Sequence, residues 1–152
     1  MSVASRLAEL GIELPAVAAP VAAYVPAVVH GDLVHTSGQL PFTAGALPAT
    51  GKVGAGVSAD DAKEYARTCA LNALAAAADA AGGLERIAGV LRVGGFVASD
   101  PSFTGQPGVI NGASEILGEI FGDAGRHARA AVGVPVLPLD SPVEVEVTFI
   151  LA

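Results

Sequence analysis

The side chains with the clearest chemical potential lie between residues 126 and 152. Arg129 opens a run of small and apolar residues, and Glu144 and Glu146 alternate with valines in a second run. A guanidinium group can donate two parallel hydrogen bonds to a carboxylate, and a glutamate can take a proton from water. From the pattern alone, a weak surface ion pair between Arg129 and a glutamate is the simpler interpretation.

Two apolar runs, 130–137 and 143–151, carry these residues and predict two β-strands joined by a proline-rich turn. In a strand, side chains two positions apart share a face. The second run therefore has one apolar face, made of Val143, Val145, Val147, Phe149 and Leu151. Glu144 and Glu146 point the other way, and we expect Arg129 on that same sheet surface.

The remaining elements are predicted from periodicity and capping residues. We expect helices over 2–10, 58–82 and 109–121, strands over 24–29, 33–40 and 89–98, and loops over 41–57 and 99–108. The order α-ββ-α-β-α-ββ favours an α+β sandwich, with two long helices packed on one face of a mixed sheet. We expect one domain over 1–152, in which residues 1–20 form a leading helix and an extended arm.

Composition and charge narrow the classes of function. Of the 152 residues, 52% are hydrophobic and 15% are charged, and the charged fraction lies below the ~25% of ordinary globular domains. We therefore expect part of the surface to be buried against other copies. A net charge of −7 with scattered cations argues against nucleic acid as a partner.

The sequence also bears on compartment and on metals. It shows no signal-peptide pattern and no apolar helix long enough for a bilayer, so we expect a cytoplasmic protein without a membrane partner. The single cysteine, Cys69, cannot form an intrachain disulfide and is predicted to pack inside a helix. Three separate histidines without ligand spacing predict no metal site.

Several segments resemble the RidA/YjgF family, and the resemblance covers nearly the whole chain from Tyr24 onward. The matching segments are AAYVPAVVHGDLVHTSGQLP, the helix from Ser58, VINGASEILGEIFG, and HARAAVGV followed by LPLDSPVEVEV. This resemblance implies a chorismate-mutase-like fold that assembles as a homotrimer. The leading helix and the loop over 99–108 are similar to a longer branch of the family, to which no reaction is firmly assigned.

The resemblance also implies a reaction and a site. RidA proteins hydrolyse reactive 2-imino acids and their enamine tautomers to 2-keto acids and ammonia, without metal or cofactor, in clefts between neighbouring subunits. By this resemblance, Arg129 binds the substrate carboxylate and Glu144 positions a water. The other matching positions are Tyr24, Ser37, Gly38, Asn111 and Ala131.

The chain departs from the family pattern at three places. Ala131 stands where many members have cysteine, and His127 stands where a proline is common. The loop over 99–108 is longer than usual. The lost pocket contact at Ala131 and the longer loop bear on which substrate is accepted and on whether the activity is kept.

Each site position also has a purely structural interpretation. These alternatives are core packing for Tyr24, a strand-end bulge for Ser37 and Gly38, a hydrogen bond in the first helical turn for Asn111, and a solvated strand position for Glu144, as for Glu146. At the level of function, the alternative is a trimer that binds small carboxylate metabolites or partner proteins without turnover. Glu144 favours the enzyme, whereas Ala131 and the longer loop favour the binding protein.

Overall fold

The computed structural model describes residues 1–17 and 22–152, so the predicted arm up to Pro20 falls partly outside the described residues. Its main elements are α1 (Val3–Glu9), β1 (Ala27–His30), β2 (Leu33–Thr36), α2 (Ala59–Ala81), β3 (Ile87–Ala98), α3 (Gln106–Phe121), β4 (Ala128–Val134) and β5 (Val143–Leu151). Short 3-10 helices occupy Leu84–Arg86, Gly122–Gly125 and Pro138–Asp140. The element order agrees with the prediction.

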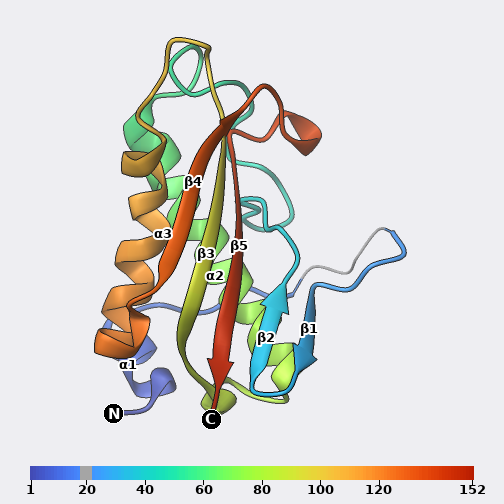
Figure 1. The fold of residues 1–152 in the computed structure, drawn as a ribbon, viewed down its shortest axis with the longest axis vertical. Coiled ribbons are helices and arrows are strands. Elements are labelled where there is room, and N and C mark those ends of the chain that lie inside the picture. The colour runs from blue at the N-terminus through green and yellow to red at the C-terminus, as the bar shows by residue number, and fades with distance from the viewer. Residues whose placement is uncertain (18–21) are drawn as a thin grey trace.

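The five strands form one mixed sheet in the order β1-β2-β5-β3-β4 (Figure 1). Strands β3 and β4 are parallel, and the other neighbours are antiparallel. Two parallel strands need a crossover connection, and α3 supplies it between β3 and β4. Strand β5 then pairs with the other side of β3. The predicted mixed sheet is confirmed, although β4 and β5, which follow one another in the chain, are not neighbours.

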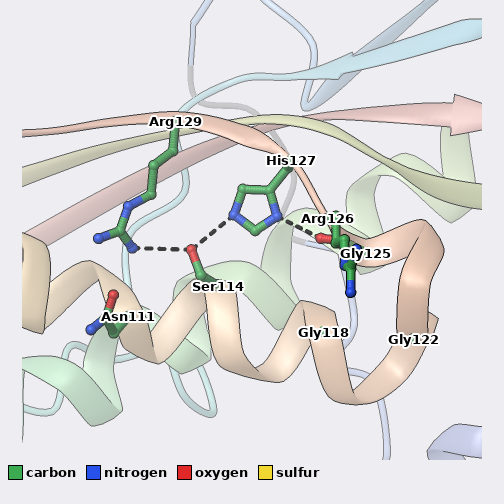
Figure 2. Close-up of a pocket in the computed structure, with 8 residues that line it drawn as sticks. All are labelled: Asn111, Ser114, Gly118, Gly122, Gly125, Arg126, His127 and Arg129. Atoms are coloured by element: carbon green, nitrogen blue, oxygen red, sulfur yellow. Dashed lines mark hydrogen bonds between the residues drawn. The ribbon is translucent and has the colours of Figure 1, made fainter.

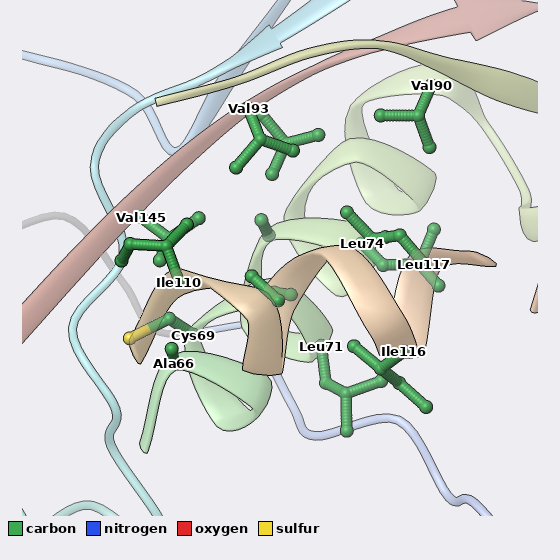
Figure 3. Packing of buried hydrophobic residues seen from close by; sticks show 14 of the residues in the cluster. Ala66, Cys69, Leu71, Leu74, Val90, Val93, Ile110, Ile116, Leu117 and Val145 are labelled. Carbon is green, nitrogen blue, oxygen red and sulfur yellow. The ribbon is translucent and has the colours of Figure 1, made fainter. Parts of the chain in front are cut away.

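Helices α2 and α3 cover one face of the sheet, as predicted (Figure 1). The apolar face of β5 and buried valines of β3 pack against both helices. This core includes Val93 of β3 and Val145 of β5 on the sheet side, and Leu74 of α2 and Leu117 of α3 on the helix side (Figure 3). Helix α2 begins at its cap Ser58, whose hydroxyl accepts a hydrogen bond from the backbone N–H of Asp61. It ends at Gly82, which adopts a left-handed conformation with φ 86°.

Small residues let the two long helices approach the sheet and each other. The alanines at 66, 70, 73 and 77 of α2 are fully buried. A side chain at Gly112 of α3 would collide with the backbone carbonyl oxygen of Lys63 on α2. Glycine is therefore required where these two helices touch. At the far end of α3, Arg6 of α1 donates a hydrogen bond of 2.8 Å to the carbonyl oxygen of Glu119.

Several predicted boundaries differ from the structure. Strand β1 begins at Ala27, because the chain from Tyr24 to Pro26 is bent, and β2 ends at Thr36. Helix α3 begins at Gln106 instead of Val109, because Pro107 fits a first helical turn, where no backbone N–H is needed. Strand β4 begins at Ala128, two residues before the apolar run.

The face of the sheet away from the helices is not covered by any described element (Figure 1). Val28 and Val132 lie on it with exposed fractions of 54% and 45%. They share this face with Glu144, Glu146 and Thr148 of β5. We call it the open face. Among the helices of residues 1–17 and 22–152, none combines the length and the hydrophobicity that a bilayer-spanning segment needs.

Candidate functional site

Arg129 lies on the helix-covered side of the sheet. It pairs in register with Val93 of β3, which is fully buried beneath the helices. Its side chain reaches α3, where Nη1 donates to Ser114 Oγ at 3.1 Å (Figure 2). Nη2 donates to the carbonyl oxygen of Pro107, also at 3.1 Å. The prediction that Arg129 shares a sheet face with Glu144 and Glu146 is therefore wrong.

The partners of Arg129 are neutral, which distinguishes it from most other cations of the chain. Within the described residues, five of the eight lysines and arginines form ion pairs, namely Arg6, Lys52, Lys63, Arg92 and Arg126. Arg129 forms none with any described residue. A guanidinium has five N–H donors, and two of them point to Ser114 and Pro107. The remaining N–H groups of Arg129 can donate hydrogen bonds to an anion that binds from outside the protomer.

An open groove of about 450 Å³ lies beside Arg129 (Figure 2). Its lining consists of Asn111, Ser114, Gly118, Gly122, Gly125, Arg126, His127 and Arg129. This set holds two arginines and no carboxylate, in a chain whose net charge is −7. The exposed Arg126 at the rim is paired with Asp123 at 3.4 Å. The local charge of the groove therefore suits an anionic ligand.

Two further groove residues were not predicted as site residues. Ser114 Oγ lies 2.8 Å from Nε2 of His127, and Nδ1 of His127 lies 2.6 Å from the carbonyl oxygen of Gly125 (Figure 2). The sequence held a signal for both. His127 lies directly before β4 and two positions before Arg129, the spacing of residues that share a face in an extended chain. Ser114 is three positions after Asn111 on α3, so these two share a helix face.

Asn111 and Ala131 lie on the same side of the sheet as Arg129. Asn111 lines the groove one turn before Ser114. Ala131 pairs in register with Gly95 and packs against the hydrophobic core. The five residues Asn111, Ser114, His127, Arg129 and Ala131 form the arginine half-site.

Glu144 lies on the open face, in register with Phe96 of β3. Its side chain is half-buried, and burial, followed by the nearby charge of Glu146, raises its pKa above the ordinary value. Gly38 lies directly against this carboxylate, because a side chain there would overlap Glu144 Oε1. Within the described part of the chain, the one ion pair of Glu146 is an exposed contact with Arg92 at 3.5 Å, which agrees with its predicted solvated position.

Ser37 fixes the segment that carries Tyr24. Its hydroxyl donates to the carbonyl oxygen of Val25 at 2.7 Å, and its backbone N–H donates to that of Pro26 at 2.8 Å. Tyr24 is 53% exposed, so core packing, the structural alternative for this residue, is wrong. The four residues Tyr24, Ser37, Gly38 and Glu144 form the glutamate half-site.

The two half-sites of one protomer lie on opposite faces of the sheet. Strand β3 separates β4, which carries Arg129, from β5, which carries Glu144. The structure thus brings the predicted residues together in two groups, and it does not bring Arg129 and Glu144 together within one chain. Joint action of these two residues requires a second copy.

Comparison with known proteins places the chain in a family. Residues 4–150 match the family model described as "YjgF/chorismate_mutase-like, putative endoribonuclease". The Trypanosoma cruzi protein TCP17 is 45% identical over 145 residues, which cover 95% of this chain and 91% of TCP17. A crystal structure from Shewanella oneidensis has a TM-score of 0.94 and 38% identity, and covers 99% of this chain and 100% of that one.

A further similar structure is that of E. coli TdcF with bound serine. It has a TM-score of 0.65 and 25% identity, and the match covers 90% of this chain and 94% of TdcF. The family match spans almost all the described elements, and the mixed sheet with helices on one face is the chorismate-mutase-like fold expected for it. The protein is therefore a member of the RidA/YjgF family.

Proposed function

We propose that the protein hydrolyses reactive 2-imino acids and their enamine tautomers to 2-keto acids and ammonia, without a cofactor, in clefts between copies of the chain. One observation carries this proposal. Arg129 is held in place by two neutral acceptors, in a groove whose lining holds no carboxylate. A cation that is already oriented and still has free donors is suited to bind a small carboxylate in one orientation.

The chemistry then follows from the two half-sites. Arg129 binds the carboxylate of the imino acid, and Glu144 accepts a proton from a water that adds to the carbon of the C=N bond. The imine nitrogen takes up this proton, which gives a carbinolamine and frees Glu144 as a base again. The nitrogen then takes up the proton of the new hydroxyl group, the C–N bond breaks, ammonia leaves and the C=O bond forms. A raised pKa makes the Glu144 carboxylate a stronger base than an exposed glutamate, which suits it to this step.

The cleft requires a second copy, because Arg129 and Glu144 lie on opposite faces of one sheet. The arginine half-site of one protomer would face the glutamate half-site of the next. Such a contact uses two different surfaces, and repeating it closes a ring, which we propose to be a trimer. Exposed valines on the open face, Val28 and Val132, fit burial against another copy.

The serine-bound structure of TdcF supports the class of ligand. Serine has a carboxylate attached to a carbon that also carries nitrogen, and a 2-imino acid has the same arrangement. The word endoribonuclease in the family description fits this chain less well. Most of its few cations are already paired, and binding to a nucleic-acid backbone requires free positive charge.

The test is imine hydrolysis with 2-aminoacrylate, generated in situ from serine by a dehydratase and followed by semicarbazone trapping. The wild type should accelerate imine decay and Arg129→Ala should not. Arg86→Ala is the matched control, because Arg86 is an exposed arginine outside both half-sites. A fully active Arg129→Ala protein would refute the assignment.

A binding function without turnover is the second candidate, and one observation favours it. The arginine half-site is complete on one face of a single protomer, whereas Glu144 is not part of it. A wild type that binds 2-oxobutanoate but does not accelerate imine decay would support this second function.

A further inference from the structure

The geometry points to His127 as a positioning residue for Arg129, acting through Ser114. This inference rests on the proposed function, because it concerns how the arginine half-site is kept ready for a carboxylate. Four hydrogen bonds carry it. Three of them run from the carbonyl oxygen of Gly125 through His127 and Ser114 to the guanidinium of Arg129 (Figure 2). In the fourth, the other end of the guanidinium donates to the carbonyl oxygen of Pro107.

The chemistry of the donors and acceptors fixes the direction of the first two bonds. A backbone carbonyl oxygen can only accept, so Nδ1 of His127 must carry the hydrogen that it directs to Gly125 at 2.6 Å. In the neutral ring, Nε2 is then a bare acceptor. The hydroxyl of Ser114, 2.8 Å away, therefore donates to Nε2.

This direction determines what Ser114 offers to Arg129. A hydroxyl has one hydrogen and two lone pairs, and Ser114 uses its one hydrogen in the hydrogen bond that it donates to His127. The oxygen is thereby left with its lone pairs for Nη1 of Arg129 at 3.1 Å. His127 thus acts on Arg129 by deciding the orientation of an intervening hydroxyl group.

Without His127, the hydroxyl of Ser114 has a competing partner. Serine and threonine inside helices commonly donate to the carbonyl oxygen four residues earlier. Thr68 on α2 does so in this protein, with Oγ1 donating to the carbonyl oxygen of Glu64 at 3.3 Å. Ser114 makes the bond to His127 instead, so loss of the ring should free it to rotate away from the guanidinium.

Spectroscopy tests the positioning directly and needs no ligand. In the wild type, ¹⁵N NMR of the imidazole should show a protonated Nδ1 and a bare Nε2 for His127. The guanidinium signals of Arg129 should be resolved, because hydrogen bonds slow its rotation. In both Ser114→Ala and His127→Ala, these guanidinium signals should collapse. An Nε2-protonated ring, or unchanged Arg129 signals in His127→Ala, would overturn the inference.

Binding provides the functional readout, with 2-oxobutanoate as the probe. Ser114→Ala and His127→Ala should each weaken binding about tenfold, the effect expected for one hydrogen bond to a charged group. Ser114→Thr keeps the hydroxyl, and His127→Gln places an amide oxygen near the position of Nε2, so both should restore binding. His30→Gln on β1 is the control for the same substitution at an exposed histidine.

A double variant separates positioning from independent contacts. If His127 acts only through Ser114, the combined loss in Ser114→Ala/His127→Ala should not exceed the larger single loss. In turnover, KM should rise while kcat stays nearly constant, because carboxylate binding is what changes. Additive losses, or wild-type binding by His127→Ala, would refute the positioning role. Absence of 2-oxobutanoate binding by the wild type would instead refute the proposed function and leave the NMR test standing.

Discussion

Mixing two inactive variants should restore activity if each cleft is built from two protomers. Arg129→Ala removes the arginine half-site and leaves the glutamate half-site intact. Glu144→Gln does the reverse. The two residues lie on opposite faces of the sheet, with β3 between their strands, so neither variant can repair itself. A mixed assembly contains clefts in which the intact half-site of one chain faces the intact half-site of the other.

The size of the recovery follows from the geometry. In a closed ring, each cleft takes one half-site from each of two neighbouring chains. In a random equimolar mixture, each half-site is intact with a chance of about one half, so about a quarter of the clefts are complete. The mixture should therefore regain about 25% of the wild-type rate, and this value does not depend on the number of chains in the ring.

The assay uses the two variants, carrying different affinity tags, unfolded and refolded together. Tandem purification of a portion proves that mixed assemblies are present, and imine decay is measured on the refolded mixture before this selection, because the value of about 25% applies to the random mixture. Each variant refolded alone is the control. Because each chain is 15.0 kDa, a trimer has a mass of about 45 kDa by light scattering. Mixed assemblies without any recovery would refute a cleft shared between protomers.

Three further predictions concern the glutamate half-site and the core. At pH 7, Glu144→Gln should be more stable than the wild type by less than about 1 kcal/mol, because burial and the charge of Glu146 disfavour the ionised carboxylate and solvent screens the effect. Thermal unfolding should show this difference fading as the pH falls below the unfolded pKa of about 4.3, where both states are protonated. Equal stability of Glu144→Gln and the wild type at pH 7 would contradict this prediction. Gly38→Ala should displace the Glu144 carboxylate and lower kcat about tenfold to 100-fold, while affinity for 2-oxobutanoate stays unchanged; an unchanged kcat would remove Glu144 from the mechanism. Cys69, which is fully buried with a pKa raised by burial and then by the charge of Glu144, should not react with a disulfide reagent until the protein unfolds, and rapid native labelling would contradict its burial.

The sequence alone was enough to predict those helices and strands whose bounds and buried faces are determined by nearby residues. Ser58 and Gly82 delimit α2, because a cap and a left-handed glycine act within a few residues of their own position. The alternation in β5 predicted its buried valines, because a strand next to a core exposes every second side chain to solvent. The family followed from the motifs around Ser37 and Arg129 and is confirmed by the comparisons.

Long-range geometry could not be predicted in the same way. Alternation within β5 says nothing of β4, because their relation passes through β3, and so the face of Arg129 was predicted wrongly. The bond between Ser114 and His127 joins a helix to the start of a strand, and its existence depends on how these two elements pack. The grouping into two half-sites likewise depends on strand order, which single-strand patterns do not contain.

The central place of β5 has a consequence for folding. It is the last strand in the chain, yet it lies between β2 and β3, and its pairing joins Ile150 to Leu33. During synthesis, the facing edges of β2 and β3 stay unpaired until β5 has been made, so the β1–β2 hairpin and the β3-α3-β4 unit are not yet joined. Contacts so distant in sequence also form slowly. Gln39 gains its backbone bonds to Val145 in this final step. The glutamate half-site therefore cannot exist before the sheet is complete.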